Sequence, residues 1–167
     1  ELNCPLSLAA TGGIFLGKEY HFDICRPGIG LYGGAPFKEA KAVVNLSLPV
    51  IQTRALAPEE AVGYGATWTA HRPSLIATLS AGYADGLIRA MSGRAVVYAN
   101  GIPCPIAGRV SMDLITVDVT HLTDIPEHME ILCEQQSIDQ LADEAGTIGY
   151  EILTSLGNRY NRSYTGV

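Results

Sequence analysis

Apolar residues take every second position in several stretches after residue 43, which is the pattern of a β-strand with one buried face. Within residues 44–50, Pro49 predicts an edge strand or a bulge, because proline has no N–H for the ladder. Asn100-Gly101 lies between two apolar runs and predicts a two-residue hairpin turn. Further strands are expected over 74–81, 94–98, 103–108, 114–119 and 129–133. Short strands at this spacing indicate a mainly β fold that is closed or nearly closed.

Two short helices are predicted near the C-terminal end. Ser137 and Gln140 have the spacing of a capping box at the start of the first helix, and Gly146 provides its end. Thr147 is expected to cap the second helix, which ends at Gly157. The first helix has a stripe of apolar residues on one face, so we expect that face to be buried.

The first 37 residues differ from the rest of the chain. Short apolar runs end in glycine-rich turns, which is typical of the loops in a βα barrel or a doubly wound sheet. Residues 28–33 match the G-x-G-x-x-G pattern of dinucleotide sites, but Ala35-Pro36 would break the helix that such a site requires. The bare N–H groups of this turn can still bind an anion, and Arg26 places a cation beside them.

Composition and charge narrow the classes of function. The chain has 167 residues, a mass of 17.8 kDa and a formal net charge of −6, which suits one domain or one domain with part of another. Its 11 basic residues are scattered, so we expect no nucleic acid partner. No apolar run approaches the roughly 18 residues that cross a membrane, and no signal peptide opens the chain, so we expect a cytoplasmic protein with no membrane partner. The four cysteines and four histidines lack the spacing of a metal site, and none is predicted.

Three glycine-framed motifs carry the candidate chemistry. Tyr64 lies in Val-Gly-Tyr-Gly-Ala-Thr, Tyr83 in Gly-Tyr-Ala-Asp-Gly-Leu-Ile-Arg, and Met112 in Arg-Val-Ser-Met-Asp. Small neighbours let a ligand or another backbone approach such residues closely. In this order and at this spacing, the motifs resemble the C-terminal part of a pyridoxal-phosphate-dependent alanine racemase.

The resemblance implies a domain organisation. Residues 38–167 are similar to the C-terminal β-domain of an alanine racemase, mainly β with two short helices. Residues 1–37 then correspond to the last strands of the (β/α)8 barrel that binds the cofactor. Such enzymes are homodimers, and the resemblance implies that the β-domain faces the barrel of the other subunit.

The resemblance also implies roles for the three motif residues. Tyr64 matches the catalytic tyrosine, which acts on one face of a pyridoxal phosphate aldimine while a lysine acts on the other. This two-base proton transfer interconverts L- and D-alanine, and D-alanine supplies cell-wall peptidoglycan. Met112 matches the residue whose backbone N–H binds the substrate carboxylate, and Tyr83 matches a tyrosine at the active-site entrance, which we also assign to substrate binding.

For the cofactor, the resemblance implies that Arg26 hydrogen-bonds the pyridine nitrogen of pyridoxal 5'-phosphate. The backbone N–H groups of Gly28 and Ile29 would hold its phosphate. Thr11 matches a serine that also binds the phosphate. Ala10 stands where asparagine is usual in the family, so that contact is lost.

Two parts of the family's cofactor site have no match in the chain. Many relatives place a further tyrosine on the phosphate, and that position is Asn158 here, with Tyr160 as a nearby substitute. The cofactor lysine of the family lies in a Val-Lys-Ala-Asn-Ala-Tyr-Gly-like run, and Lys18, Lys38 and Lys41 lie in no such run. We therefore expect the isolated chain to be inactive, and to need a second subunit or a missing N-terminal barrel portion as its partner.

Two other classes of function stay open on the sequence alone. A non-catalytic β-barrel module would bind a partner protein and use Tyr64 and Tyr83 as aromatic anchors. A nucleotide-binding protein would use the glycine-rich turn that follows Arg26.

Overall fold

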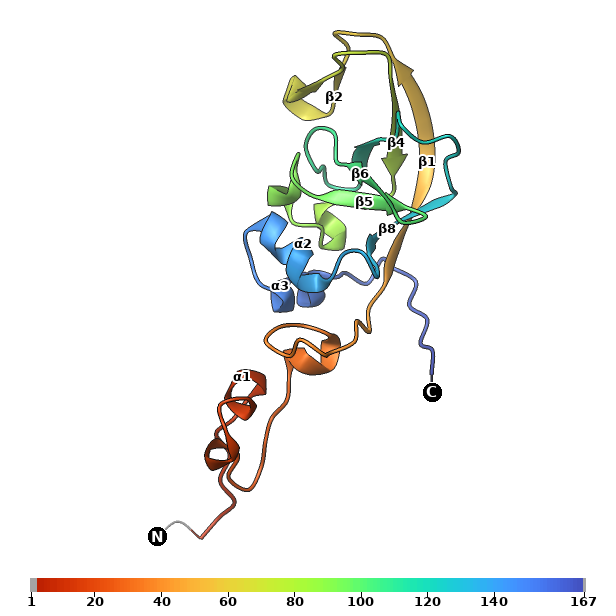
Figure 1. Cartoon of the computed structure of the whole chain (residues 1–167). Helices are drawn as coiled ribbons and strands as arrows, with labels where there is room; N and C mark the ends of the chain where they lie inside the picture. The colour runs from red at the N-terminus through yellow and green to blue at the C-terminus, as the bar shows by residue number, and fades with distance from the viewer. Residues whose placement is uncertain (1–2, 167) are drawn as a thin grey trace.

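The computed structural model describes residues 3–166, and its main feature is an antiparallel sheet that nearly closes on itself (Figure 1). Within these residues the sheet has six strands, in the order β6-β5-β8-β1-β4-β7. A bridge between Ile106 and Val117 joins the end of β6 to β7, which brings the two edges of the sheet together. The predicted closed or nearly closed β fold is therefore confirmed. The strands are β1 Leu46–Leu56, β4 Ser74–Leu79, β5 Val96–Ala99, β6 Ile102–Pro105, β7 Ile115–Asp118 and β8 His128–Leu132.

The hydrophobic core fills the interior of this sheet. Strands from all around the sheet contribute side chains that are fully shielded from solvent: Leu48, Leu79, Val97, Val117 and Ile131. Each such side chain contributes roughly 1.5–3 kcal/mol through its burial. Helices α2 (Ile138–Ala145) and α3 (Gly149–Ser155) cover one end of the sheet and bury Leu141 and Ile152 in the same cluster (Figure 1).

Strand β1 changes partners along its length. Its first part pairs with β8 and its second part with β4, and the register shifts once against each neighbour. Pro49 lies at the exchange: it is opposite His128 of β8, while its carbonyl accepts a hydrogen bond from the Ser80 N–H over 3.1 Å. The predicted bulge is therefore confirmed, but the edge position is wrong, because β1 lies between β8 and β4 in the sheet.

The short-range turn and cap signals are largely confirmed. Asn100 and Gly101 have φ angles of 49° and 81° and connect β5 to β6 as a hairpin. The Ser137 hydroxyl accepts a hydrogen bond from the Gln140 N–H, and the Gln140 side chain accepts one from the Ser137 N–H, which completes the capping box at the start of α2. Gly146 ends α2 in the left-handed conformation, with a φ of 69°.

The predicted cap of α3 is wrong. Ile148 occupies the N-cap position and makes no side-chain cap, while the Thr147 hydroxyl donates to the carboxylate of Glu151 instead of accepting from a backbone N–H. A carboxylate one turn into the helix accepts hydrogen bonds more strongly than a neutral group, so the hydroxyl turns towards it. Across residues 3–166, no helix is long and apolar enough to cross a membrane.

A two-stranded ribbon stands at the end of the molecule away from α2 and α3. It consists of β2 (Ala61–Val62) and β3 (Trp68–Thr69), which pair in antiparallel fashion (Figure 1). Trp68 and Val62 pack on a small second cluster of buried residues that includes Leu56 and Ile76. The ribbon is therefore anchored to the ends of β1 and β4.

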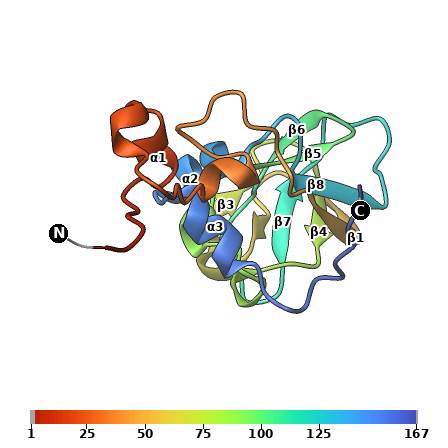
Figure 2. The ribbon, with the colours of Figure 1, turned by 90° about the horizontal axis from the view of Figure 1, so that it is seen from below.

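Residues 3–37 extend from the opposite end. They contain the short helices α1 (Thr11–Ile14), η1 (Lys18–Tyr20) and η2 (Ile29–Tyr32), and a single parallel bridge joins Ala10 to Arg26. Figure 2, which looks at the molecule from below, shows α1 to one side of α2 and α3. Many large apolar side chains of this segment are exposed: Leu8, Phe15, Leu16, Phe22, Ile24 and Leu31.

The hydroxyl of Tyr160 is buried and has no hydrogen-bond partner among the residues that the structure describes. Its ring packs against the main core cluster. Burial raises the pKa of this phenol and the negative charge of Asp85 raises it further, while Arg159 acts in the opposite direction. A buried hydroxyl without a hydrogen bond costs about 1–3 kcal/mol, so this group opposes folding.

Replacing this hydroxyl tests that account. We expect Tyr160→Phe to leave the free energy of unfolding at about pH 8 unchanged or to raise it by about 1 kcal/mol. Above a pH of about 10 the phenol ionises in the unfolded state but keeps its proton in the folded state, so the wild-type protein loses stability that the variant keeps. Urea denaturation at the two pH values, with the exposed Tyr164→Phe as control, measures both effects. A loss of stability in Tyr160→Phe at pH 8 would mean that the hydroxyl is bonded after all.

Candidate functional site

Tyr64 lies on a tight turn of residues 63–66 between β2 and β3, the Tyr64 turn. Gly63 and Gly65 have φ angles of 76° and 74°, in the left-handed region that favours glycine. The chain therefore reverses within a few residues, and Tyr64 is 74% exposed. The guanidinium of Arg109 lies against the turn, since a Cβ added at Gly65 would be 3.4 Å from its Nη1. This end of the molecule thus presents an exposed tyrosine on a turn whose backbone lies against a cation.

The loops that carry Tyr83 and Met112 are joined by backbone hydrogen bonds. The Tyr83 N–H donates to the Ser111 carbonyl and the Ala84 N–H donates to the Met112 carbonyl, both over 2.9 Å. Because the Ser111–Met112 peptide is planar and trans, holding its carbonyl directs the Met112 N–H the opposite way. That N–H has no protein acceptor within residues 3–166, so it is available to a ligand. Tyr83 and Met112 are both about half exposed beside it.

Gly82 permits this contact between the two loops. A Cβ at this position would be 2.3 Å from the Met112 carbonyl oxygen and 2.4 Å from that of Ser111, too close for any real contact. Its φ of −153° is extended backbone that any residue adopts, so the requirement is steric rather than conformational.

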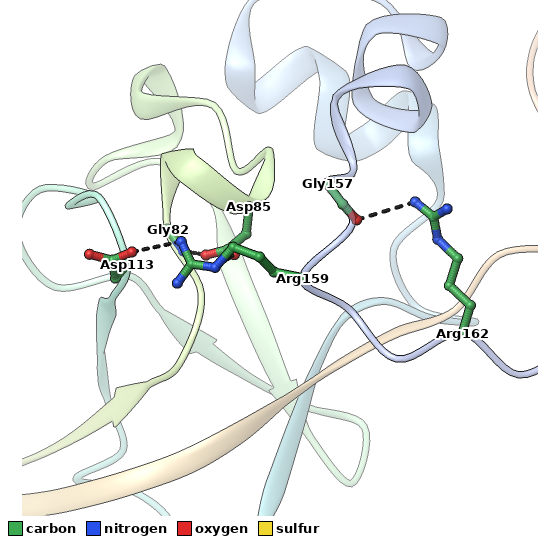
Figure 3. Close-up of polar contacts among 6 residues, drawn as sticks. All are labelled: Gly82, Asp85, Asp113, Gly157, Arg159 and Arg162. Atoms are coloured by element: carbon green, nitrogen blue, oxygen red, sulfur yellow. Dashed lines mark hydrogen bonds and ion pairs between the residues drawn. The ribbon is translucent and has the colours of Figure 1, made fainter.

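Arg159, in the C-terminal tail, bridges two acidic residues of these loops, and we call the three residues the Arg159 clamp (Figure 3). Its Nε lies 3.0 Å from Asp85 Oδ1 and its Nη1 lies 2.7 Å from Asp113 Oδ1. The Asp85 side chain is only 5% exposed, and its other oxygen accepts a hydrogen bond from the Gly82 N–H over 2.8 Å. Asp85 follows Tyr83 in the first loop, and Asp113 follows Met112 in the second. None of these ion pairs was predicted from the sequence.

Thr11, Gly28 and Gly30 form a small cradle at the opposite end, the Thr11 cradle. The buried Thr11 hydroxyl accepts hydrogen bonds from the Gly28 N–H over 2.8 Å and from the Gly30 N–H over 3.4 Å. Ile29 begins η2 between these two glycines. Arg26 lies at the start of the same segment, and its guanidinium donates to the Ser7 hydroxyl and to the Leu8 carbonyl. The structure thus brings together the four residues predicted for the cofactor, and adds Gly30.

Tyr150 of α3 also reaches the cradle. A Cβ added at Gly28 would be 2.0 Å from the Tyr150 hydroxyl, so the phenol lies directly on the bare glycine backbone. Tyr160, the suggested substitute for Asn158, does not have this role in the structure, because its hydroxyl is buried against the core. Hydroxyl groups and the N–H groups of a glycine turn are donors that suit a phosphate, so these residues fit the phosphate of a cofactor. The Gly28 and Gly30 N–H groups donate to the Thr11 hydroxyl in this structure, so a phosphate would take the place of that contact.

The predicted site residues form two separate groups in one chain. Figure 1 shows β2, which leads into the Tyr64 turn, and α1, which begins at Thr11, at opposite ends of the molecule. The β-domain and helices α2 and α3 lie between them. One copy of the chain therefore does not bring Tyr64 to the Thr11 cradle. In the part of the chain that the structure covers, no cluster of three His, Cys, Asp or Glu residues could hold a metal ion.

The steric role of Gly82 yields a prediction for stability. We expect Gly82→Ala to lower the free energy of unfolding by about 1–3 kcal/mol or more, because the methyl group would push the two loops apart. Gly12→Ala is the matched control, since the nearest atom to its added Cβ would be 4.0 Å away. Chemical denaturation of both variants measures the difference, and equal stabilities would contradict the close packing at Gly82.

The comparisons with known proteins agree with this architecture. The family model described as "Alanine racemase, C-terminal domain" matches residues 43–164. The alanine racemase of Dinoroseobacter shibae is 64% identical over 165 residues, which are 99% of this chain and 47% of that protein. The alanine racemase of Ruegeria sp. is 62% identical over 165 residues, with 98% and 48% covered. The chain spans about half the length of the curated relatives it matches.

Solved structures show the same relationship. The crystal structure of the Bartonella henselae alanine racemase, which holds covalently bound pyridoxal phosphate, matches with a TM-score of 0.93 and 43% identity over 98% of this chain and 47% of that one. The biosynthetic alanine racemase of Pseudomonas aeruginosa matches with a TM-score of 0.90 and 36% identity over 99% of this chain and 49% of that one. The family match over most of the chain and the shared fold lead to one conclusion: this chain belongs to the alanine racemase family, and corresponds to the C-terminal part of such an enzyme.

Proposed function

We propose that the chain is the C-terminal part of an enzyme that interconverts L- and D-alanine with pyridoxal 5'-phosphate as cofactor. The observation that carries this proposal is the pair of half-sites, the Thr11 cradle at one end and an exposed tyrosine on a glycine turn at the other. Residues 1–37 belong to the cofactor-binding barrel and residues 38–167 form the β-domain. In the cell, the product D-alanine would supply peptidoglycan.

The cofactor half-site lies in the N-terminal segment. The Thr11 hydroxyl and the backbone N–H groups of Gly28 and Ile29 would hold the phosphate, which would replace the hydrogen bond that the Gly28 N–H makes to the Thr11 hydroxyl. Arg26 would hydrogen-bond the pyridine nitrogen. When bound, the cofactor would supply an electron sink that makes the α-proton of alanine removable at neutral pH. A fixed guanidinium on one end and a cradle on the other would set the orientation of the ring.

The other half-site would handle the proton and the substrate. Tyr64 would take the α-proton of alanine at its phenol oxygen on one face and return it in the reverse reaction. The Met112 N–H, which has no protein acceptor in the described part of the chain, would hold the substrate carboxylate, and Tyr83 would line the entrance. These groups are all exposed on the β-domain, so they would act on a ligand brought by another surface.

That other surface would be the barrel of a second subunit. The separation of Tyr64 from the Thr11 cradle supports a dimer, because each half-site needs a counterpart that its own chain places at the far end. The exposed apolar side chains of residues 3–37 support a further partner, the N-terminal barrel portion that would carry the cofactor lysine. Without that portion, Tyr64 would serve one face of the substrate and the other face would have no base.

The isolated chain should therefore not racemise alanine. We expect no D-alanine when the 167 residues are incubated with L-alanine and pyridoxal phosphate, and racemisation when they replace the matching part of the Dinoroseobacter shibae relative in a chimaeric enzyme. A D-amino-acid oxidase assay measures the product, and intact mass verifies that no complementing fragment is present. D-alanine formation by the pure chain would contradict the assignment of the missing base.

Tyr64 is tested in the same chimaera. We expect Tyr64→Phe to lower kcat by roughly 10²–10⁴-fold, since the ring stays but the proton-accepting oxygen is lost. The matched control is Tyr164→Phe, which removes a hydroxyl from a side chain that is 81% exposed. A Tyr64→Phe variant that folds and keeps its kcat would refute the catalytic role of this phenol.

A further inference from the structure

The Arg159 clamp lies outside every residue assigned above, yet it holds both loops that carry the substrate-side residues. We propose that Arg159 is a positioning residue, which fixes the direction of the Met112 N–H by tying Asp85 and Asp113 together. This inference rests on the proposed function, because it takes Met112 as the binder of the substrate carboxylate. Arg159 itself would touch neither substrate nor cofactor.

The first step of the argument concerns the Tyr83 loop. Asp85 is almost fully buried and carries a charge, so it needs partners for both oxygens. One oxygen accepts from the Gly82 N–H over 2.8 Å, and the other lies 3.0 Å from Arg159 Nε. The Asp85 carbonyl also accepts from the Gly157 N–H over 3.1 Å. Removing Arg159 would leave a buried carboxylate with one partner, and the loop would have to move to let water in.

The second step concerns the Met112 loop. Asp113 is about half exposed and does not need Arg159 for its own solvation. Its 2.7 Å contact with Arg159 Nη1 therefore serves to position the Met112 loop, because it draws the residue after Met112 towards the Tyr83 loop. Only the planar fork of an arginine can meet two carboxylates at fixed angles, because a lysine offers a single point charge.

The third step connects the clamp to the Met112 N–H. The Ser111 carbonyl is held by the Tyr83 N–H, and the Met112 carbonyl is held by the Ala84 N–H. These two bonds fix the peptide planes on both sides of Met112, and with them the direction of its free N–H. They persist only while the two loops stay together, which the Arg159 clamp ensures from the side and Gly82 permits from within.

The C-terminal tail offers a matched control. Arg162 lies three residues further on and donates to the carbonyls of Leu156 and Gly157 over 3.1 and 3.2 Å, and Figure 3 shows it directed to Gly157 and away from both acids. Arg159→Met and Arg162→Met remove the same charge from the same tail. Only the first should loosen the loops that carry Tyr83 and Met112.

The clamp itself is tested by amide hydrogen exchange on the full 167-residue chain, without any assay of activity. In Arg159→Met we expect the Tyr83 and Ala84 amides to exchange at least about tenfold faster, with the amides of β4 unchanged. In Arg162→Met the Tyr83 and Ala84 amides should exchange as in the wild-type chain. The proposal would be overturned if the Tyr83 and Ala84 amides of Arg159→Met exchanged at the wild-type rate. It would also be overturned if the amides of β4 became faster by the same factor.

The positioning role is tested by kinetics in the chimaeric racemase. Loss of one well-placed N–H bond to a carboxylate corresponds to a rise in the KM for alanine of about tenfold, so we expect this in Arg159→Met with kcat within about threefold. Arg159→Lys should give an intermediate KM. A merely structural role would lower the amount of active enzyme and leave KM unchanged, and that result would overturn the proposal.

Should Arg159→Met fail to fold, Asp113→Asn provides the same test while Asp85 keeps its ion pair. We expect a smaller change in the same direction, about threefold in KM and in the exchange of the Ala84 amide. If neither the KM nor the exchange rate of the Ala84 amide changed, the proposal would be overturned. An inactive wild-type chimaera would count against the proposed racemase function alone, because the exchange experiment would still decide whether the clamp exists.

Discussion

The partner exchange of β1 is the constraint on which the rest of the structure depends. Its 11 residues span about 35 Å, and the strand pairs with β8 at one end and β4 at the other. This exchange lets one strand belong to both parts of the curved sheet, so that the sheet nearly closes with a bridge between β6 and β7. The length of β1 also separates the N-terminal segment, which precedes Leu46, from the Tyr64 turn, which follows Leu56. The division of the candidate site into two halves is a consequence of this one strand.

Close backbone contact has the corresponding role in the part of the candidate site that carries Tyr83 and Met112. The loops that carry Tyr83 and Met112 lie so near each other that only glycine fits at position 82. Two backbone hydrogen bonds and the Arg159 clamp then hold them in register. A donor that acts through its backbone can be positioned only by the peptide planes around it, so the surrounding contacts matter more than the Met112 side chain. The cradle follows the same logic, since bare glycine N–H groups supply its donors.

The features that the sequence predicted correctly depend mostly on neighbouring residues. The hairpin at Asn100-Gly101 and the capping box at Ser137 follow from local backbone preferences, and both are present. For the strand at Pro49, the sequence predicted the bulge correctly but the edge position wrongly. A missing N–H also suits a strand that changes partners, and that exchange depends on residues far away in the chain. The glycine motifs also identified the loops that carry Tyr64, Tyr83 and Met112, although their roles remain proposals.

Long-range contacts escaped the sequence for a physical reason. Arg159 meets Asp113 across 46 residues, and Tyr150 reaches Gly28 only because α3 packs beside the N-terminal segment. No periodicity or turn signal encodes such pairs. The Tyr83 motif contains Asp85, but the burial of its carboxylate, which requires a cation, depends on the folded tail. The short ribbon of β2 and β3 was missed as well, since two-residue strands are too brief to show a period.

The central claim is that the two half-sites of one chain serve two different active sites in a dimer. Mixing two inactive chimaeras, one with Tyr64→Phe and one with Arg26→Ala, tests it most directly after the subunits have been dissociated and reassembled. In a mixed dimer with shared sites, one site has both residues intact and the other has neither, so about a quarter of the wild-type activity should return. If both residues acted within a single chain, each site would keep one defect and no activity would return, which would contradict the account.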